Sequence, residues 1–195
     1  DENDKTVIGN AQPKFYGGLN NSFTYKGFDL SIFLTFSYGN EVLNATKLVT
    51  SKVGSLNYNA LDVMNSSNRW MTINSDGQKV TDPGELAALN AGKTVAAYHD
   101  AQQGDNYIHS WAVEDASYLK LSNVTLGYTF PKKLIARVGL KNLRLYATGN
   151  NLLTWTKYSG FDPEVSTMKS GLTPGVDFGA YPLSRSFIFG LNVAF

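Results

Sequence analysis

The sequence predicts an all-β fold, an antiparallel barrel that crosses a membrane with its strands, and three observations support it. Several segments alternate apolar and polar residues with period two, over the ~9–11 residues that a membrane-spanning strand needs. The chain holds 11 Phe, 11 Tyr and 18 Gly, while charged residues are only 17%, a mixture that favours aromatic-rich strands. No stretch approaches the ~18 apolar residues of a membrane helix, and strands in lipid must form a barrel to pair every backbone group.

The clearest predicted strand lies near 27–39. Within Phe28–Tyr38 every even position is apolar, and Phe33 is the only large apolar residue at an odd position. Aromatic residues at both ends of this row suit the interfacial girdles of barrel strands. A first strand near 14–26 alternates in the same way, although Asn21 falls in its apolar phase.

Three further strands are predicted in the second half of the chain. They lie near 117–130, 141–151 and 183–195, each with apolar residues at alternate positions. The run Tyr118–Leu121 blurs the phase of the first of these, which predicts a β-bulge there. The last strand ends on Phe195.

The predicted connections alternate in length. Lys26-Gly27 joins the first two strands, 39–116 follows, 131–141 is compact, and 151–182 is longer. Bacterial barrels alternate tight periplasmic turns with long extracellular loops in this way. We therefore expect 39–116 and 151–182 to be extracellular loops, and the last strand to end at the periplasmic face.

The long loop 39–116 is expected to carry structure of its own, because structureless loops of that length are uncommon. Asp82-Pro83-Gly84-Glu85 resembles a capping box with Pro at the first helical position. A short helix is predicted to follow and to stop near Gly92.

Charge and residue usage exclude several functions. The net charge of +1 gives no reason to expect a nucleic-acid partner, and the absence of Cys excludes thiolate chemistry. The two histidines, His99 and His109, sit in no metal-ligand or nucleophile pattern. Asp162, Glu164 and Asp177 lack the spacing of a known calcium loop. We expect no catalytic residue, metal or cofactor, and therefore no enzyme.

The polar phase of the strands indicates a wide barrel. In the first three strands it is mostly Ser, Thr, Asn and Gly, and the fourth adds Arg144, which suits water or a polar plug. Five strands cannot close such a barrel and would leave two open edges. We expect residues 1–195 to be the C-terminal part of a larger barrel, with the other strands upstream. The basic turn of Lys132, Lys133, Arg137 and Lys141 is interpreted as solvated, near lipid phosphates.

Six stretches carry a family signature, at Gly17–Leu30, Ser117–Pro131, Leu143–Leu152, Tyr158–Val165, Tyr181-Pro182 and Phe187–Phe195. They include GGLNNSFTYKGFDL, SYLKLSNVTLGYTFP, YSGFDPEV and FIFGLNVAF. These stretches resemble the C-terminal region of TonB-dependent outer-membrane transporters. More narrowly, they resemble the SusC/RagA family of nutrient importers in Bacteroidetes-type bacteria.

The resemblance implies a barrel of about 22 strands, set in outer-membrane lipid and plugged by an N-terminal domain. It implies import of an oligosaccharide or peptide nutrient, with a SusD-like surface lipoprotein as lid and energy from the TonB complex. Phe195 resembles the signal that the barrel-assembly machinery reads. Whether two barrels pair as a dimer is left open.

Six residues are singled out as contacts for substrate or lid, because aromatic rings stack on sugars and carboxylates accept hydroxyl hydrogen bonds: Trp70, Trp155, Tyr158, Asp162, Glu164 and Tyr181. The alternative is that the loop around Trp155–Glu164 packs on itself, with Asp162-Pro163 making a turn. Arg69-Trp70 fits an anchor for the lid protein, because Trp and Arg are common at interfaces. The alternative is that the two residues form a small core within the loop.

Two other functions compete with transport. A soluble secreted β-sandwich that binds glycans would explain the alternation and the aromatic residues, but it would not explain apolar rows that run the full length of the strands. An outer-membrane enzyme barrel would need a Ser–His pairing, which is not recognisable in this sequence.

Overall fold

The computed structural model describes residues 5–51, 59, 61–95, 108, 110–167 and 174–195. His99 and His109 lie outside the described residues. The chain divides into two compact units. The larger comprises residues 9–42, 114–176 and 180–195, and the smaller comprises residues 1–8, 43–113 and 177–179.

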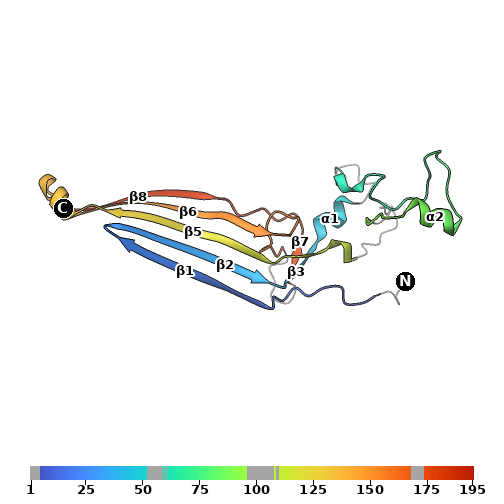
Figure 1. Cartoon of the computed structure of the whole chain (residues 1–195), viewed down its shortest axis with the longest axis horizontal. Coiled ribbons are helices and arrows are strands. Elements are labelled where there is room, and N and C mark those ends of the chain that lie inside the picture. Colours follow the sequence, from blue (N-terminus) through green and yellow to red (C-terminus); the bar gives the residue numbers. More distant parts are fainter. Residues whose placement is uncertain (1–4, 52–58, 60, 96–107, 109, 168–173) are drawn as a thin grey trace. The chain divides into compact units, whose positions relative to one another are not determined.

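The larger unit is built on one five-stranded antiparallel sheet of order β1-β2-β5-β6-β8. Its long strands lie side by side in Figure 1, with β1 and β8 at the two edges. The bounds are β1 Phe15–Tyr25, β2 Phe28–Tyr38, β5 Tyr118–Thr129, β6 Asn142–Thr156 and β8 Ser186–Ala194. The predicted antiparallel strands are confirmed, and the sheet is open rather than closed.

A two-residue turn sets the register of β1 and β2. Lys26 and Gly27 have φ values of 46° and 89°. Positive φ at both central residues is the requirement of a type I′ hairpin, whose twist matches that of the strands it joins. The pairing then runs without interruption from Tyr25↔Phe28 to Phe15↔Tyr38.

A β-bulge at Ser122 changes the phase of β5, as the blurred alternation predicts. Phe33 pairs with Asn123, but the next residue, Leu34, pairs with Leu121, so Ser122 is the extra residue. Before the bulge the apolar side chains of β5 are at odd positions, and after it they are at even positions. Lys120 therefore shares a face with the polar residues of β2.

The two ends of the sheet differ in their connections. The turn end carries Lys26-Gly27 and a compact link, which contains helix α3 (Lys132–Ile135) and the 3-10 turn η5 (Ala136–Val138). The chain's C-terminus lies at this end too (Figure 1). The loop end is where β1 and β8 begin and where β2 and β6 finish. Strand β6 runs to Thr156, five residues beyond the end expected from the sequence.

The smaller unit is irregular, with several short elements: α1 Ala45–Thr50, η2 Asp62–Met64, α2 Pro83–Leu89 and η4 Ser110–Ala112. Asp82 caps α2 by accepting the Glu85 N–H at 2.9 Å, as the capping motif predicts, and Asn90 follows the last helical residue. Strands β3 (Glu41–Asn44), β4 (Val113–Asp115) and β7 (Val176–Asp177) form a second sheet of order β4-β3-β7.

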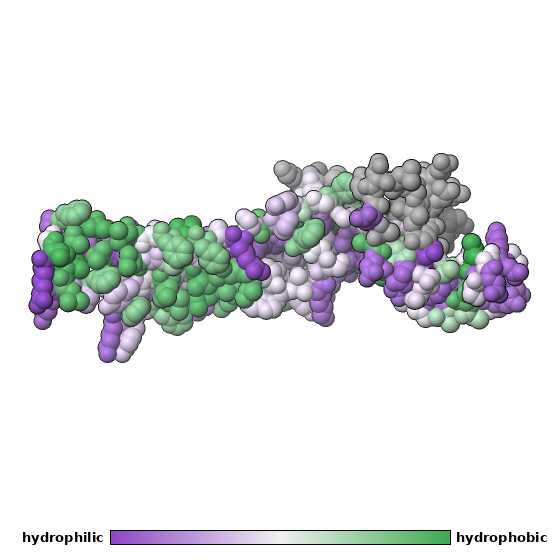
Figure 2. Space-filling view, turned by 90° about the horizontal axis from the view of Figure 1, so that it is seen from above, coloured by the Kyte–Doolittle hydropathy of each residue, from purple (hydrophilic) through white to green (hydrophobic). Residues whose placement is uncertain are grey.

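The two faces of the large sheet differ in chemistry. The apolar face carries continuous rows of exposed hydrophobic side chains, including Leu19, Phe23, Leu126, Leu145, Phe187 and Phe189. Figure 2 shows hydrophobic residues gathered over this part of the molecule. The polar face carries Ser, Thr, Asn and charged side chains. Among the described residues, no helix is long and apolar enough to cross a membrane.

Aromatic residues mark both ends of the apolar face. At the loop end, the rings of Phe15 and Tyr38 stack with centroids 5.0 Å apart. At the turn end, Tyr128 packs against Phe28 at 4.5 Å and against Phe130 at 5.0 Å. Ten residues separate Phe15 from Tyr25, or ~33 Å of strand, which a tilt of ~40° reduces to ~25 Å. This is the height of the apolar band of outer-membrane barrels.

Candidate functional site

Side-chain hydrogen bonds link neighbouring strands across the polar face. They join Thr35 to Ser122 at 2.7 Å, Thr125 to Thr148 at 2.8 Å, Asn123 to Asn150 at 2.7 Å, and Asn150 to Ser186 at 3.0 Å. These side chains hydrogen-bond one another, so this part of the face needs no apolar cover. We call this face the polar wall, and two groups of charged side chains lie on it.

An ion pair spans three strands near the turn end of this wall. Arg144 Nε on β6 donates to Asp29 Oδ1 on β2 at 3.0 Å, and its Nη2 lies 2.5 Å from Oδ2. The strand between them contributes Gly127, where a Cβ would lie 2.5 Å from both side chains. Glycine at this position therefore leaves the space through which the pair closes.

A buried lysine lies near the loop end of the same wall. Lys120 is only 4% exposed, and its Nζ pairs with Glu164 and lies 4.0 Å from Asp162 Oδ2. The Tyr118 hydroxyl donates to Glu164 Oε1 at 2.7 Å, and Asp162 Oδ1 accepts the Glu164 N–H at 3.0 Å. A buried cation needs such partners, because leaving it unpaired in a low-dielectric site is costly. These four side chains, which we call the Lys120 latch, fasten the loop after β6 onto the sheet.

Two further contacts hold the first part of this loop. Tyr158 is 6% exposed and packs in a small core with Val42 and Ala116. Ser159 donates its N–H to Glu114 Oε2 at 2.9 Å and its hydroxyl to Oε1 at 2.8 Å. The stretch from Tyr158 to Glu164 is thus a built part of the larger unit rather than a free loop.

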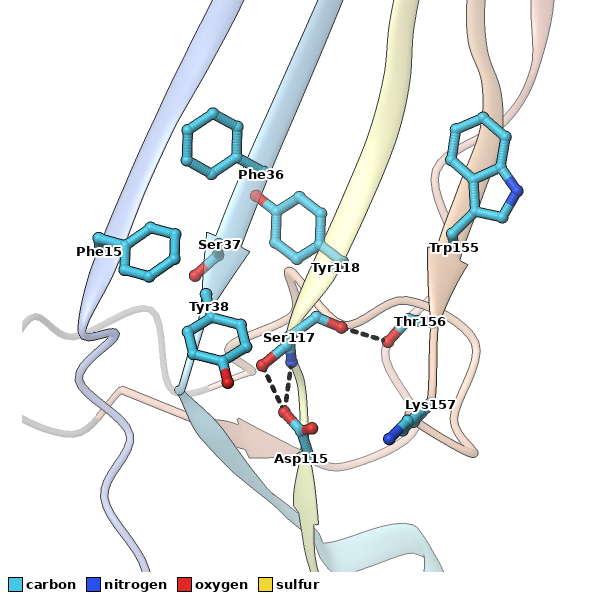
Figure 3. A pocket seen from close by; sticks show the side chains of 10 residues that line it. All are labelled: Phe15, Phe36, Ser37, Tyr38, Asp115, Ser117, Tyr118, Trp155, Thr156 and Lys157. Carbon is cyan, nitrogen blue, oxygen red and sulfur yellow. Dashed lines mark hydrogen bonds between the residues drawn. The ribbon is translucent and has the colours of Figure 1, made fainter.

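An open pocket of about 610 Å³ lies at the loop end. Figure 3 shows its lining, which comes from the ends of β1, β2, β5 and β6 and from Asp115. Aromatic rings of Phe15, Phe36, Tyr38, Tyr118 and Trp155 alternate there with the polar groups of Ser37, Asp115, Ser117, Thr156 and Lys157. The rings of Phe36, Tyr38 and Trp155 belong to the apolar row, whereas Ser37, Tyr118 and Thr156 lie on the polar face, so the pocket borders both faces of the sheet.

Asp115 is the acidic group of this pocket. Ser117 donates to Asp115 Oδ1 twice, from its hydroxyl at 2.5 Å and from its N–H at 2.9 Å (Figure 3). These hydrogen bonds favour the charged form and hold the pKa of the Asp115 carboxyl below its usual range. The Ser117 hydroxyl also accepts the Gly39 N–H at 2.9 Å, so the carboxylate orders the junction between β2 and β5.

The sequence-predicted contact residues take different places. Tyr158, Asp162 and Glu164 come together in the loop after β6, with Asp162 buried and Glu164 engaged by Lys120. Trp155 lies in β6 rather than in a loop, opposite Leu119 in the apolar row. Tyr181 projects into solvent, 93% exposed.

Two predicted residues lie elsewhere. Trp70 belongs to the smaller unit. Its backbone N–H donates to Val95 O at 2.9 Å, next to an isolated β-bridge between Arg69 and Val95. Phe195 is exposed at the turn end, one residue after β8.

Three residues of this site were not singled out from the sequence. Lys120 and Tyr118 lie in a run of blurred alternation, and only the bulge shows that they face the polar side. Phe161 is exposed beside the latch residues and lines a second pocket with Pro163, Leu183 and Arg185. Its position between Gly160 and the Asp162-Pro163 turn was the available signal.

Among the described residues, no group of three or more His, Asp or Glu side chains could hold a metal ion. Asp162 and Glu164, two of the residues considered for calcium, face Lys120 instead.

No protein-family profile matches the chain. It is 35% identical over 98% of its length to TonB-dependent receptor P3 of Formosa agariphila, and 31% identical over 99% to TonB-dependent receptor P39 of that species. It is 28% identical over its full length to TonB-dependent receptor SusC of Bacteroides thetaiotaomicron. The chain spans only 16–17% of the length of these relatives.

Solved structures give the same result for the fold. The structure of the RagAB peptide transporter matches 97% of this chain with a TM-score of 0.72 at 24% identity. The RagAB peptide importer in its closed-closed state matches with a TM-score of 0.70 at 25% identity. The chain covers 18% of each of those chains.

Proposed function

Since this chain belongs to the SusC family of TonB-dependent receptors, we propose that the complete protein imports a nutrient across the outer membrane of a Bacteroidetes-type bacterium. The chain supplies five neighbouring strands of a barrel wall of about 22 strands. Its loop end faces the outside of the cell, and its turn end faces the periplasm.

The exposed apolar face carries this proposal. Phe189, near the middle of β8, is 81% exposed, and similar side chains follow every strand. Water would penalise such a surface, whereas hydrocarbon accepts it. A soluble glycan-binding sandwich, the competing function, would bury this row against a second sheet, which the high exposure of Phe189 speaks against.

The partners follow from the same family. We propose that a SusD-like lipoprotein covers the loop end and that the TonB complex supplies energy through a part of the protein outside this chain. The RagAB structures are of a peptide transporter. The proposed substrate class therefore includes peptides as well as oligosaccharides. The groups of the loop-end pocket that lie on the polar face, Ser37, Tyr118 and Thr156, suit hydrogen bonding to either polymer. Phe195, exposed one residue after β8, suits an aromatic signal for the barrel-assembly machinery.

Uptake by intact cells tests the proposal. Labelled oligosaccharides and labelled peptides are offered to wild-type cells and to strains lacking this protein, TonB or the SusD-like lipoprotein. We expect uptake of one ligand class to disappear without this protein or TonB, and to fall strongly without the lipoprotein. A small sugar that diffuses through general porins is the control.

Two results would contradict the proposal. Uptake that persists without TonB excludes energised import. A complete protein that stays soluble and monodisperse without detergent excludes the membrane barrel and favours the sandwich.

A further inference from the structure

The compact link Pro131–Lys141 at the turn end has the composition of a membrane-surface element. It contains four cations, Lys132, Lys133, Arg137 and Lys141, and no acidic residue. Within the described part of the chain, none of the four makes a salt bridge. All four carry their charge toward solvent, so the link presents an unneutralised positive surface.

Two large apolar side chains are exposed on the same short link. Leu134 is 58% exposed and Val138 is 71% exposed, while Ile135 between them is buried. Leu134 lies in α3 and Val138 in the adjoining turn η5, so both exposed aliphatic side chains belong to one short segment that also carries the cations. Basic residues flanking exposed aliphatic ones are the pattern of interfacial segments, whose apolar side enters the boundary between headgroups and acyl chains.

Backbone contacts fix this link to the sheet. Lys141 N donates to Ala194 O at 2.7 Å and Phe130 N to Leu143 O at 3.0 Å, and within the link Leu140 N donates to Ile135 O at 3.2 Å. Gly139, with φ of 78°, ends the helical turn and returns the chain to β6. The position of the exposed pair is therefore set by the strands.

The link continues the aromatic end of the apolar face. Phe130 directly precedes it and packs edge-on against Tyr128. Phe195 is exposed at the same end of the sheet, and Lys26 holds its Nζ 5.1 Å from the centroid of the Tyr25 ring. Cations and rings thus gather where the apolar band ends, at the depth of lipid headgroups.

We propose that Pro131–Lys141 anchors the barrel in the phospholipid leaflet on the periplasmic side. Its cations bind the phosphates of anionic phospholipids, and Leu134 and Val138 enter the acyl region. An acidic protein partner would explain the cations but not the exposed aliphatic pair that continues the apolar face. The inference rests on the proposed function, because it requires the sheet to lie in a membrane.

Spin labels test the depth of the link. The chain has no cysteine, so Leu134→Cys and Val138→Cys are labelled with a nitroxide in the complete protein, on a background without other accessible cysteines, in phosphatidylglycerol–phosphatidylcholine vesicles. We expect collisions with oxygen, which partitions into lipid, to exceed those with a water-soluble nickel chelate. Asp76→Cys, exposed in the smaller unit, is the aqueous control, and Leu30→Cys on β2 is the membrane control.

The controls separate the two ways of failing. A label at Leu30 in lipid with labels at Leu134 and Val138 in water would overturn the anchor and leave the proposed function intact. Water access at all three positions would overturn the proposed function itself.

Charge reversal tests the phosphate contact independently. Lys132→Glu with Lys133→Glu should lower the preference of the protein for spin-labelled phosphatidylglycerol over phosphatidylcholine by at least about threefold. Lys79→Glu with Lys93→Glu changes the net charge equally in the smaller unit and should leave the preference unchanged. An equal preference in the first variant and the wild type would contradict lipid binding by the link.

Discussion

Arg144 reaches across an entire strand to pair with Asp29, and Gly127 beneath them makes the reach possible. Both side chains would meet a Cβ at position 127 at 2.5 Å. The ion pair is partly exposed, with side-chain exposures of 26% and 36%. Its contribution to stability is therefore small, about 1 kcal/mol or less after screening.

This geometry predicts that Gly127→Ala stabilises the barrel only when the ion pair is absent. In the wild type, the new methyl group displaces the two side chains and cancels the gain that alanine normally gives in a strand, ~0.5–1 kcal/mol over glycine. With Asp29→Asn and Arg144→Gln present, Gly127→Ala should stabilise the barrel. Urea unfolding of the complete protein in lipid vesicles, read as a double-mutant cycle, measures the difference. Equal effects of Gly127→Ala in both backgrounds would show that the pair does not need the space.

The Lys120 latch predicts a local effect. Lys120→Met leaves Asp162 and Glu164 facing each other without the cation, and breaking a buried pair on one side costs roughly 3–5 kcal/mol. Hydrogen exchange at residues 158–166 should accelerate, while exchange in β2 and β6 stays slow. Further substitution with Asp162→Asn and Glu164→Gln should restore part of the protection.

Arg144→Met is the matched control for this prediction. It also removes a paired cation from the polar face, but near the turn end. Exchange at 158–166 should be unchanged in this variant. If both variants accelerate exchange in the loop equally, the loop is not held by Lys120 in particular.

The apolar face predicts which side of β2 tolerates charge. Ile32→Arg, near the middle of the strand, places a guanidinium in hydrocarbon and should destabilise the barrel by about 2–4 kcal/mol. Ser31→Arg adds the same group to the polar face and should cost much less. Refolding of the complete protein into lipid vesicles from urea measures both. Similar costs on the two faces would contradict the membrane assignment.

Asp115 predicts an acid-sensitive junction. Its pKa is below the ordinary value of 3.8 because Ser117 hydrogen-bonds the charged form. The contribution to stability is therefore present above about pH 4 and is lost as the pH falls through the depressed pKa. Protection of the amide of residue 117, which donates to the Asp115 carboxylate at 2.9 Å, should fall in that range.

Ser117→Ala removes the hydroxyl that donates to Asp115, which is the main cause of the lowered pKa. This variant should therefore flatten the acid dependence. Ser31→Ala also removes a serine hydroxyl, but one that donates to the Asn20 amide at 3.3 Å, so its profile should follow the wild type. An unchanged profile in Ser117→Ala would assign the acid sensitivity to another carboxylate.

Period-two alternation predicted the sheet well because each strand has one apolar and one polar face. Phe28–Tyr38 is a strand from its first residue to its last. The end of β6 was missed because Asn151 interrupts the apolar row, although Leu153 and Trp155 resume it in phase. The sequence therefore places Trp155 in a loop, whereas the structure places it in β6.

The site was harder to predict than the strands. Asp162 and Glu164 are visible in the sequence as candidates, but their partner is 44 residues away from Glu164 on another strand. Alternation alone assigned Lys120 to no face, since the bulge that orients it is a single residue. Pairing across a sheet depends on register, which a bulge changes and a sequence shows only as a blurred pattern.

Ser122 also constrains how this gene can change. Its side chain is replaceable, because a single hydroxyl contact, with Thr35, depends on it among the residues that the structure describes. The residue itself cannot be removed, because deleting that codon would shift the alternation of β5 by one position. Tyr118 and Lys120 would then face the apolar side, and Leu119 and Leu121 the polar side. Natural variants should therefore substitute freely at this position while keeping the length of the segment fixed.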